Sequence, residues 1–103
     1  MAMLESVKRA GKTKVSSNMR EVAFTYYAPA AKKVYLAGKF NDWNTTSLLM
    51  KKDKDGTWRT TVRLAPGNYE YKYFVDGAWA QNVPGTDMVP NSFGTYNCVI
   101  GVQ

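Results

Sequence analysis

Histidine is absent from this sequence of 103 residues, and cysteine occurs once, at Cys98. Without histidine the chain lacks the commonest general base and the commonest metal ligand in proteins. A single cysteine allows no internal disulfide and no cysteine metal cluster. These absences exclude Ser-His-Asp, Cys-His and zinc chemistry from the candidate functions, and we expect no cofactor.

Long apolar runs are also missing. No window of about 18 uncharged apolar residues exists, so the sequence predicts no transmembrane helix. Residues 1–4 run directly into Glu5, Lys8 and Arg9, which leaves no apolar stretch long enough for a signal peptide. Together with the lack of disulfides, this pattern predicts a cytoplasmic location.

The excess of positive charge is concentrated near the N-terminus. The chain carries a formal net charge of +6, and residues 1–20 contain five basic residues and one acidic residue. We expect residues 1–19 to form a flexible basic leader and residues 20–103 to form one folded domain. A solvated leader is the main interpretation of this charge, and nucleic-acid binding through the leader is the lesser alternative.

From Glu21 onward, apolar and polar residues alternate with the period of two that indicates half-buried β-strands. Turn signals separate the alternating runs, and Asp76-Gly77 is a strong hairpin signal. The pattern predicts an all-β fold, an antiparallel β-sandwich of immunoglobulin-like type but without the cysteine pair of antibody domains. About seven strands are expected, from Glu21 to before Pro29 and at residues 34–38, 48–52, 58–64, 69–76, 78–80 and 95–102, with a long loop at 81–94.

Two tryptophans lie outside the alternating pattern. Trp43 lies in a stretch of asparagine and aspartate, and Trp79 follows a turn and has small or polar neighbours. From the pattern alone, each ring is either an anchor folded onto the core or an exposed platform, and neither interpretation is favoured. Trp58 instead shares its strand face with apolar residues and is expected in the core.

Polar residues of two predicted strands have an ordinary interpretation. Lys72 lies on the outward face of its strand, where a lysine is usually solvated. Thr95 and Asn97 share one face of the last strand, whereas Tyr96 and Cys98 share the other. Cys98 is most simply a small core residue.

Exposed aromatic rings beside amide, hydroxyl and ammonium groups suit carbohydrate binding. The C–H face of a pyranose ring stacks on the negative face of an indole, and Asn, Thr and Lys side chains can bond the sugar hydroxyls. Each stacked ring contributes ~1–2 kcal/mol and each hydrogen bond ~1 kcal/mol, which after entropy costs predicts a Kd on the order of 0.1–1 mM.

Three ordered motifs resemble a known family. Residues 34–43, VYLAGKFNDW, resemble the V-x-L-x-G-x-F-N-x-W opening of the glycogen-binding domain of the AMP-activated protein kinase β subunit. Residues 67–79 resemble its G-x-Y-x-Y-K-F-x-V-D-G-x-W run, and residues 93–100 resemble its closing G-x-x-N-x-x-I/V segment. These domains belong to carbohydrate-binding module family 48, and the resemblance covers about residues 33–102.

The resemblance implies a non-catalytic domain of the early-set immunoglobulin-like type that binds α-1,4-linked glucan such as glycogen. Trp43 and Trp79 would be stacking platforms set at an angle that suits a curved glucan, and Lys72 would bond sugar hydroxyls between them. Phe93 stands where family members commonly have an aliphatic residue that presses against the glucan. Polar contacts would come from two residues of the last strand, Thr95 and Asn97.

The sequence leaves two other function classes beside glucan binding. The first is a protein-interaction or regulatory β-sandwich whose sugar site is secondary or lost, acting as a homodimer or with an unknown protein partner. Because little sequence follows Val102, we expect no C-terminal segment for binding kinase partners. The second class, an enzyme, is not expected, because Asp53 and Asp55 lie in one hairpin loop and Asp76 occupies a turn.

Overall fold

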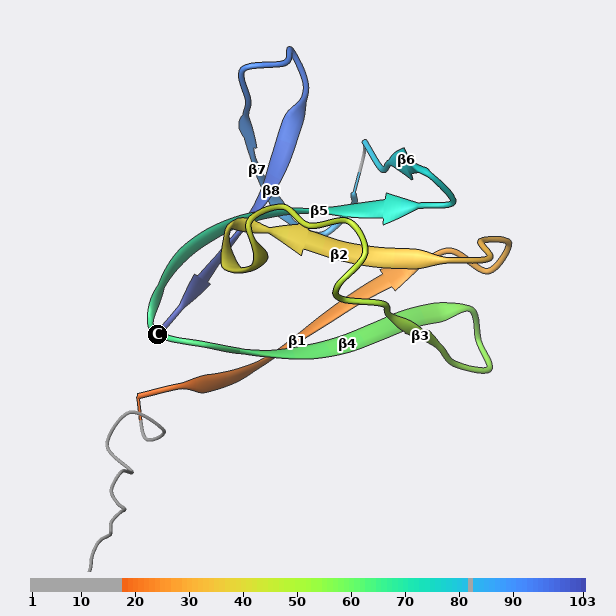
Figure 1. Cartoon of the computed structure of the whole chain (residues 1–103), viewed down its shortest axis with the longest axis horizontal. Helices are drawn as coiled ribbons and strands as arrows, with labels where there is room; N and C mark the ends of the chain where they lie inside the picture. The colour runs from red at the N-terminus through yellow and green to blue at the C-terminus, as the bar shows by residue number, and fades with distance from the viewer. Residues whose placement is uncertain (1–17, 82) are drawn as a thin grey trace, which may run out of the picture.

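The computed structural model describes residues 18–81 and 83–103, which form two antiparallel β-sheets (Figure 1). Residues 1–17 of the expected leader lie outside the described part. In the first sheet, β4 (Thr57–Leu64) lies between β1 (Arg20–Tyr27) and the short β3 (Lys51–Lys52). All eight residues of β1 pair with β4, from Arg20 opposite Leu64 to Tyr27 opposite Thr57.

The second sheet carries the remaining strands. Its order is β2–β5–β8–β7, and β6 pairs with the end of β5. A short 3₁₀-helix, η1, follows β2 directly. The elements of this part of the chain are β2 (Val34–Gly38), η1 (Lys39–Asn41), β5 (Gly67–Val75), β6 (Ala78–Trp79), β7 (Asp87–Pro90) and β8 (Tyr96–Val102). The predicted all-β antiparallel sandwich is therefore confirmed, and no helix in the described residues is long and apolar enough to cross a membrane.

The core lies between the two sheets, because alternation along the strands sends one face of each sheet inward. Phe24 of β1 meets Tyr71 of β5 edge-on, with ring centroids 5.0 Å apart. Trp58 is 6 % exposed, and its indole N–H donates to the carbonyl of Ala28 at 2.9 Å, which confirms the core assignment of this tryptophan. The other fully or nearly fully buried apolar residues of the described part are Val34, Leu36, Ala37, Met50, Leu64, Tyr73, Val83 and Cys98.

The expected strand at residues 48–52 is wrong in extent. The N–H of Leu36 donates to the carbonyl of Leu48, and the N–H of Met50 donates to the carbonyl of Val34, both at 2.9 Å. Residues 48–50 therefore run along β2, and only β3 pairs with β4. The chain crosses from one sheet to the other within this run, which a continuous hydrophobic pattern cannot reveal.

The expected loop at residues 81–94 contains a strand that the sequence analysis missed. β7 pairs with β8, and Met88 lies opposite Cys98. A short edge strand ending in Pro90 gives little periodic signal. The β7–β8 hairpin projects from the body of the sandwich (Figure 1), and Tyr96, expected to face the core, is 54 % exposed.

The turn between β5 and β6 forms as predicted from Asp76-Gly77. Both residues have positive φ, 48° and 86°. The Asp76 carboxylate accepts the backbone N–H of Lys32 at 2.9 Å and that of Lys33 at 2.7 Å, and the Asp76 N–H donates to the carbonyl of Lys33. These bonds attach the hairpin that carries Trp79 to the segment preceding β2.

Candidate functional site

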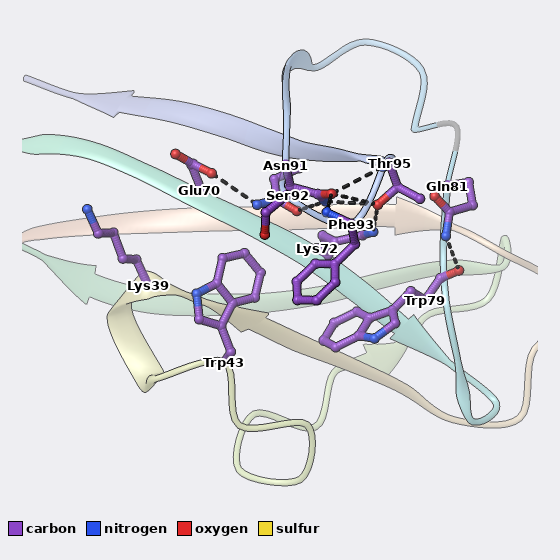
Figure 2. A pocket seen from close by; sticks show the side chains of 11 residues that line it. Lys39, Trp43, Glu70, Lys72, Trp79, Gln81, Asn91, Ser92, Phe93 and Thr95 are labelled. Atoms are coloured by element: carbon purple, nitrogen blue, oxygen red, sulfur yellow. Dashed lines mark hydrogen bonds between the residues drawn. The ribbon is translucent and has the colours of Figure 1, made fainter.

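A groove with a volume of about 810 Å³ lies on the outer face of the second sheet (Figure 2). Along β5, Tyr71 and Tyr73 point into the core, so Glu70 and Lys72 point to the opposite face and into the groove. This face is enclosed by residues of the β2–β3 segment, of β6 and the residue range after it, and of the β7–β8 hairpin. The side chains that line the groove are Lys39, Trp43, Glu70, Lys72, Trp79, Gln81, Asn91, Ser92, Phe93, Thr95 and Asn97.

Trp43 is presented by a tight loop immediately after η1. Asp42 and Trp43 both adopt left-handed backbone conformations, with φ of 55° and 59°, which are strained for residues with side chains. The Trp43 N–H donates to the carbonyl of Gly38 at 2.9 Å. The Asn41 side chain accepts the Gly38 N–H at 2.9 Å and donates to the carbonyl of Asn44 at 3.1 Å. These bonds hold the indole in a defined position against the backbone strain.

The rings of Trp43 and Trp79 face the same groove. Their centroids are 6.4 Å apart, and their planes meet at 76°. Trp79 is 37 % exposed and also contacts Phe74, with ring centroids 5.0 Å apart and planes at 65°. Of the two interpretations left open by the sequence, the structure excludes the core anchor for both rings.

Lys72 is buried under the residues that enclose the groove. It is only 7 % exposed, so the ordinary interpretation of a solvated strand lysine is wrong. Its Nζ atom lies 5.7 Å from the centroid of the Trp79 ring and donates to Thr95 Oγ1 at 3.4 Å. The indole and the hydroxyl thus replace part of the hydration of the ammonium group.

The wall opposite the tryptophans comes from the β7–β8 hairpin. Phe93 at its tip is 88 % exposed, and Figure 2 shows its ring directed toward the groove between the two indoles. Asn97 is 8 % exposed, and its Nδ2 donates to Glu70 Oε1 at 3.0 Å. Asn97 Oδ1 accepts a hydrogen bond from Asn91 Nδ2 at 2.9 Å. The groove therefore combines three aromatic rings with a hydrogen-bonded polar floor.

All six residues that the sequence analysis expected at a site line this one groove, but five other lining residues were missed. Glu70 could have been found, because it precedes Lys72 by two positions in a strand and so shares its face. Asn91 and Ser92 lie in a stretch with no periodicity. The missed residues are Lys39, Glu70, Gln81, Asn91 and Ser92. Nowhere in residues 18–81 and 83–103 do three acidic or cysteine side chains gather as a metal site would require.

A β-sandwich with aromatic rings and polar side chains in a groove on one outer sheet face is typical of β-sandwich carbohydrate-binding modules. The chain matches the family model described as the glycogen recognition site of AMP-activated protein kinase over residues 20–103. The chain therefore belongs to this family, which confirms the resemblance carried by its three motifs.

Curated relatives share the same part of the chain. It is 34 % identical over 77 residues to the AMP-activated protein kinase subunit beta-2 of Mus musculus, covering 75 % of this chain and 27 % of that protein. It is 36 % identical over 72 residues to subunit beta-1 of Bos taurus, covering 70 % and 25 %. It is 38 % identical over 79 residues to Protein FLOURY ENDOSPERM 6, chloroplastic, of Oryza sativa subsp. japonica, covering 77 % and 14 %. The chain thus spans about a quarter of the kinase subunits and a smaller part of the rice protein.

Proposed function

We propose that this chain binds α-1,4-linked glucan, such as glycogen, without catalysing a reaction on it. Trp43 and Trp79 stack on sugar rings, and Lys72 donates to sugar hydroxyls between them. Phe93 covers the ligand from the opposite wall. Further polar contacts come from the last strand, through Thr95 and Asn97.

The observation that carries this proposal is the pair of indoles set at 76° over one groove. An α-1,4-linked chain turns from one glucose to the next, so its successive C–H faces point in different directions. Two rings at a steep angle can each stack on one glucose of such a chain, whereas coplanar rings suit a flat chain. Membership in the glycogen recognition family supports the same ligand class.

The absence of catalysis belongs to the same proposal. Glycoside hydrolysis requires two carboxyl groups about 5–9.5 Å apart on either side of the scissile bond. Glu70 alone supplies a carboxylate among the described residues that line the groove, and Asn97 bonds it from one side. Incubation of the chain with maltoheptaose should release no shorter oligosaccharides, and cleavage retained after repurification would refute this part.

Isothermal titration with maltoheptaose tests the binding. From the stacking and hydrogen-bond terms, we expect a Kd on the order of 0.1–1 mM and quenching or a shift of the tryptophan fluorescence. Cellohexaose, which is β-1,4-linked and flat, serves as the matched ligand and should bind much more weakly. If there is no heat and no fluorescence change at ~10 mM maltoheptaose, the proposed function is wrong.

A protein partner is the second candidate function, because the kinase relatives are named as subunits. A homodimer or a complex with another protein would be visible as a mass above that of one chain by light scattering. The cytoplasm remains the proposed compartment, although the name of the rice relative places that protein in the chloroplast.

A further inference from the structure

Asn91 is the most connected side chain on the groove floor. Its Oδ1 accepts the backbone N–H of Phe93 at 3.0 Å and that of Thr95 at 3.1 Å. Its Nδ2 donates to Thr95 Oγ1 at 2.8 Å and to Asn97 Oδ1 at 2.9 Å. One amide therefore holds both the loop that carries Phe93 and two residues of the proposed ligand-contacting set.

These bonds also determine which way the Asn97 amide points. Because Asn91 donates to Asn97 Oδ1, the Nδ2 of Asn97 is left to donate to Glu70 Oε1, which it does at 3.0 Å. A carboxylate can only accept at this contact, so the reversed amide would place two acceptors against each other. The order of donors and acceptors along the floor is thus set from both ends, by Asn91 and by Glu70.

The Thr95 hydroxyl is likewise occupied by protein partners. Its Oγ1 accepts from Asn91 Nδ2 and, at 3.4 Å, from Lys72 Nζ, and it lies 3.1 Å from Asn91 Oδ1. The network therefore continues from Glu70 through Asn97, Asn91 and Thr95 to the buried ammonium of Lys72. Lys72 and Asn97 in this network are buried, and the other members are partly buried. Polar groups satisfied in this way favour a single arrangement of side chains before a ligand arrives.

We propose that Asn91 is the positioning residue of the groove, which fixes the Phe93 loop and the amide orientation of Asn97 for glucan binding. This inference rests on the proposed function, because the binding experiment that tests it needs a glucan ligand. Asn91 acts through Phe93, Thr95 and Asn97 and needs no contact of its own with the sugar.

The variant Asn91→Asp separates the two roles of this side chain. The carboxylate still accepts the N–H groups of Phe93 and Thr95, so the loop is retained. Its second oxygen now faces Asn97 Oδ1, and the Asn97 amide must reverse, which brings its oxygen against Glu70. We expect the Kd for maltoheptaose to rise about tenfold, the equivalent of losing one well-made buried hydrogen bond.

A second substitution should rescue the first. In the double variant Asn91→Asp with Glu70→Gln, the amide introduced on β5 can donate to the reversed Asn97 oxygen, and the network closes again with every bond running the other way. The Kd of the double variant should therefore return to within about threefold of that of Glu70→Gln alone, a coupling that independent sites would not show. Asn68→Asp introduces the same charge on β5 outside the groove and should leave the Kd within about twofold of wild type.

The possible outcomes are distinguishable. If wild type binds maltoheptaose and Asn91→Asp binds equally well, or if Glu70→Gln fails to rescue it, the role of Asn91 is refuted while the proposed function stands. If wild type itself does not bind, the proposed function fails, and the inference fails with it.

Hydrogen exchange of the wild-type chain tests the arrangement even if Asn91→Asp does not fold. The backbone amides of Phe93 and Thr95 should exchange much more slowly than that of Ser92, whose amide has no hydrogen-bond partner in the described part of the chain. Equal exchange at these three amides would contradict the proposal.

Discussion

Lys72 illustrates how a charged side chain on the outer face of a sheet can become buried. Its position in the alternation of β5 places it opposite the core, yet it is 7 % exposed because an indole and the β7–β8 hairpin cover it. A buried ammonium is unfavourable unless hydrogen bonds or aromatic faces replace its hydration. A ligand hydroxyl in the groove would complete that replacement, so binding and the burial of Lys72 support each other.

Replacing Lys72 by methionine should weaken glucan binding while the chain remains folded. Methionine keeps the unbranched apolar stem but loses the donor to the sugar, so we expect a three- to tenfold increase in Kd, corresponding to ~1 kcal/mol. Titration with maltoheptaose measures the Kd, and circular dichroism monitors the fold. Lys51→Met, at an exposed position of β3 in the other sheet, is the matched control. Equal Kd values for Lys72→Met and wild type would remove Lys72 from the proposed site.

The Asp76 carboxylate ties the turn of the β5–β6 hairpin to the segment before β2. Asp76 accepts two backbone N–H groups from the segment before β2 and has a left-handed conformation itself. Since Trp79 follows three residues later and pairs opposite Phe74, the position of this indole depends on that attachment.

Asp76→Ala should therefore lower both stability and affinity. We expect the free energy of unfolding to fall by ~1–3 kcal/mol, because two backbone donors lose their charged acceptor and alanine is less tolerant of positive φ than aspartate. Urea unfolding followed by fluorescence measures this change. Asp87→Ala, an exposed position of β7, should change stability by less than about 0.5 kcal/mol. A stability loss as small as that of Asp87→Ala would contradict the attachment role of Asp76.

The strands that the sequence predicts well are those in which local pattern and tertiary pairing agree. β4 alternates along its length, and in β5 Tyr69, Tyr71 and Tyr73 alternate in sequence with Glu70 and Lys72. The Asp76-Gly77 turn has the backbone conformation that its residues favour. The prediction of one strand at residues 48–52 was wrong because this segment pairs first with β2 and then with β4. β7 was missed because a short edge strand between loop residues has no periodicity of its own.

The site was predicted less completely than the fold. The motifs contain Trp43, Lys72 and Trp79, which are separated in the sequence, and the fold brings them to one sheet face. Asn91 belongs to none of the motifs, and its importance appears only when its amide is seen bonded to Phe93, Thr95 and Asn97. Such a role depends on the path of a loop, which hydrophobic pattern does not determine.

The second sheet serves two purposes in the molecule as a whole. Its inner face contributes tyrosines, leucine and cysteine to the core, and its outer face carries the groove. Alternate residues of β5 face the core and the groove. A substitution on the groove side of β5 is therefore next to residues that pack in the core. Burial raises the pKa of Tyr71 from 10.0 to about 12 and raises the pKa of its neighbour Tyr73 as well.

These raised pKa values predict a loss of stability at alkaline pH. A phenol that titrates near 10.0 in the unfolded chain and near 12 in the folded chain stabilises the fold fully below pH 10, and this contribution is lost as the pH rises toward 12. We expect the urea midpoint to fall across this range. Tyr71→Phe, which removes one of the two phenols, should show a shallower decline from pH 10 to 12. An identical decline in both proteins would exclude Tyr71 as a cause.

Titration of three tryptophan variants with maltoheptaose decides whether the angled indoles form the binding surface. Trp43→Ala and Trp79→Ala should each raise the Kd about five- to thirtyfold with little loss of thermal stability, because each ring contributes ~1–2 kcal/mol of stacking energy at a surface groove. Trp58→Phe, in the core, should lower the unfolding temperature and leave the Kd within about twofold of wild type. If Trp43→Ala and Trp79→Ala fold and bind maltoheptaose as tightly as the wild-type chain, the glucan does not bind in this groove.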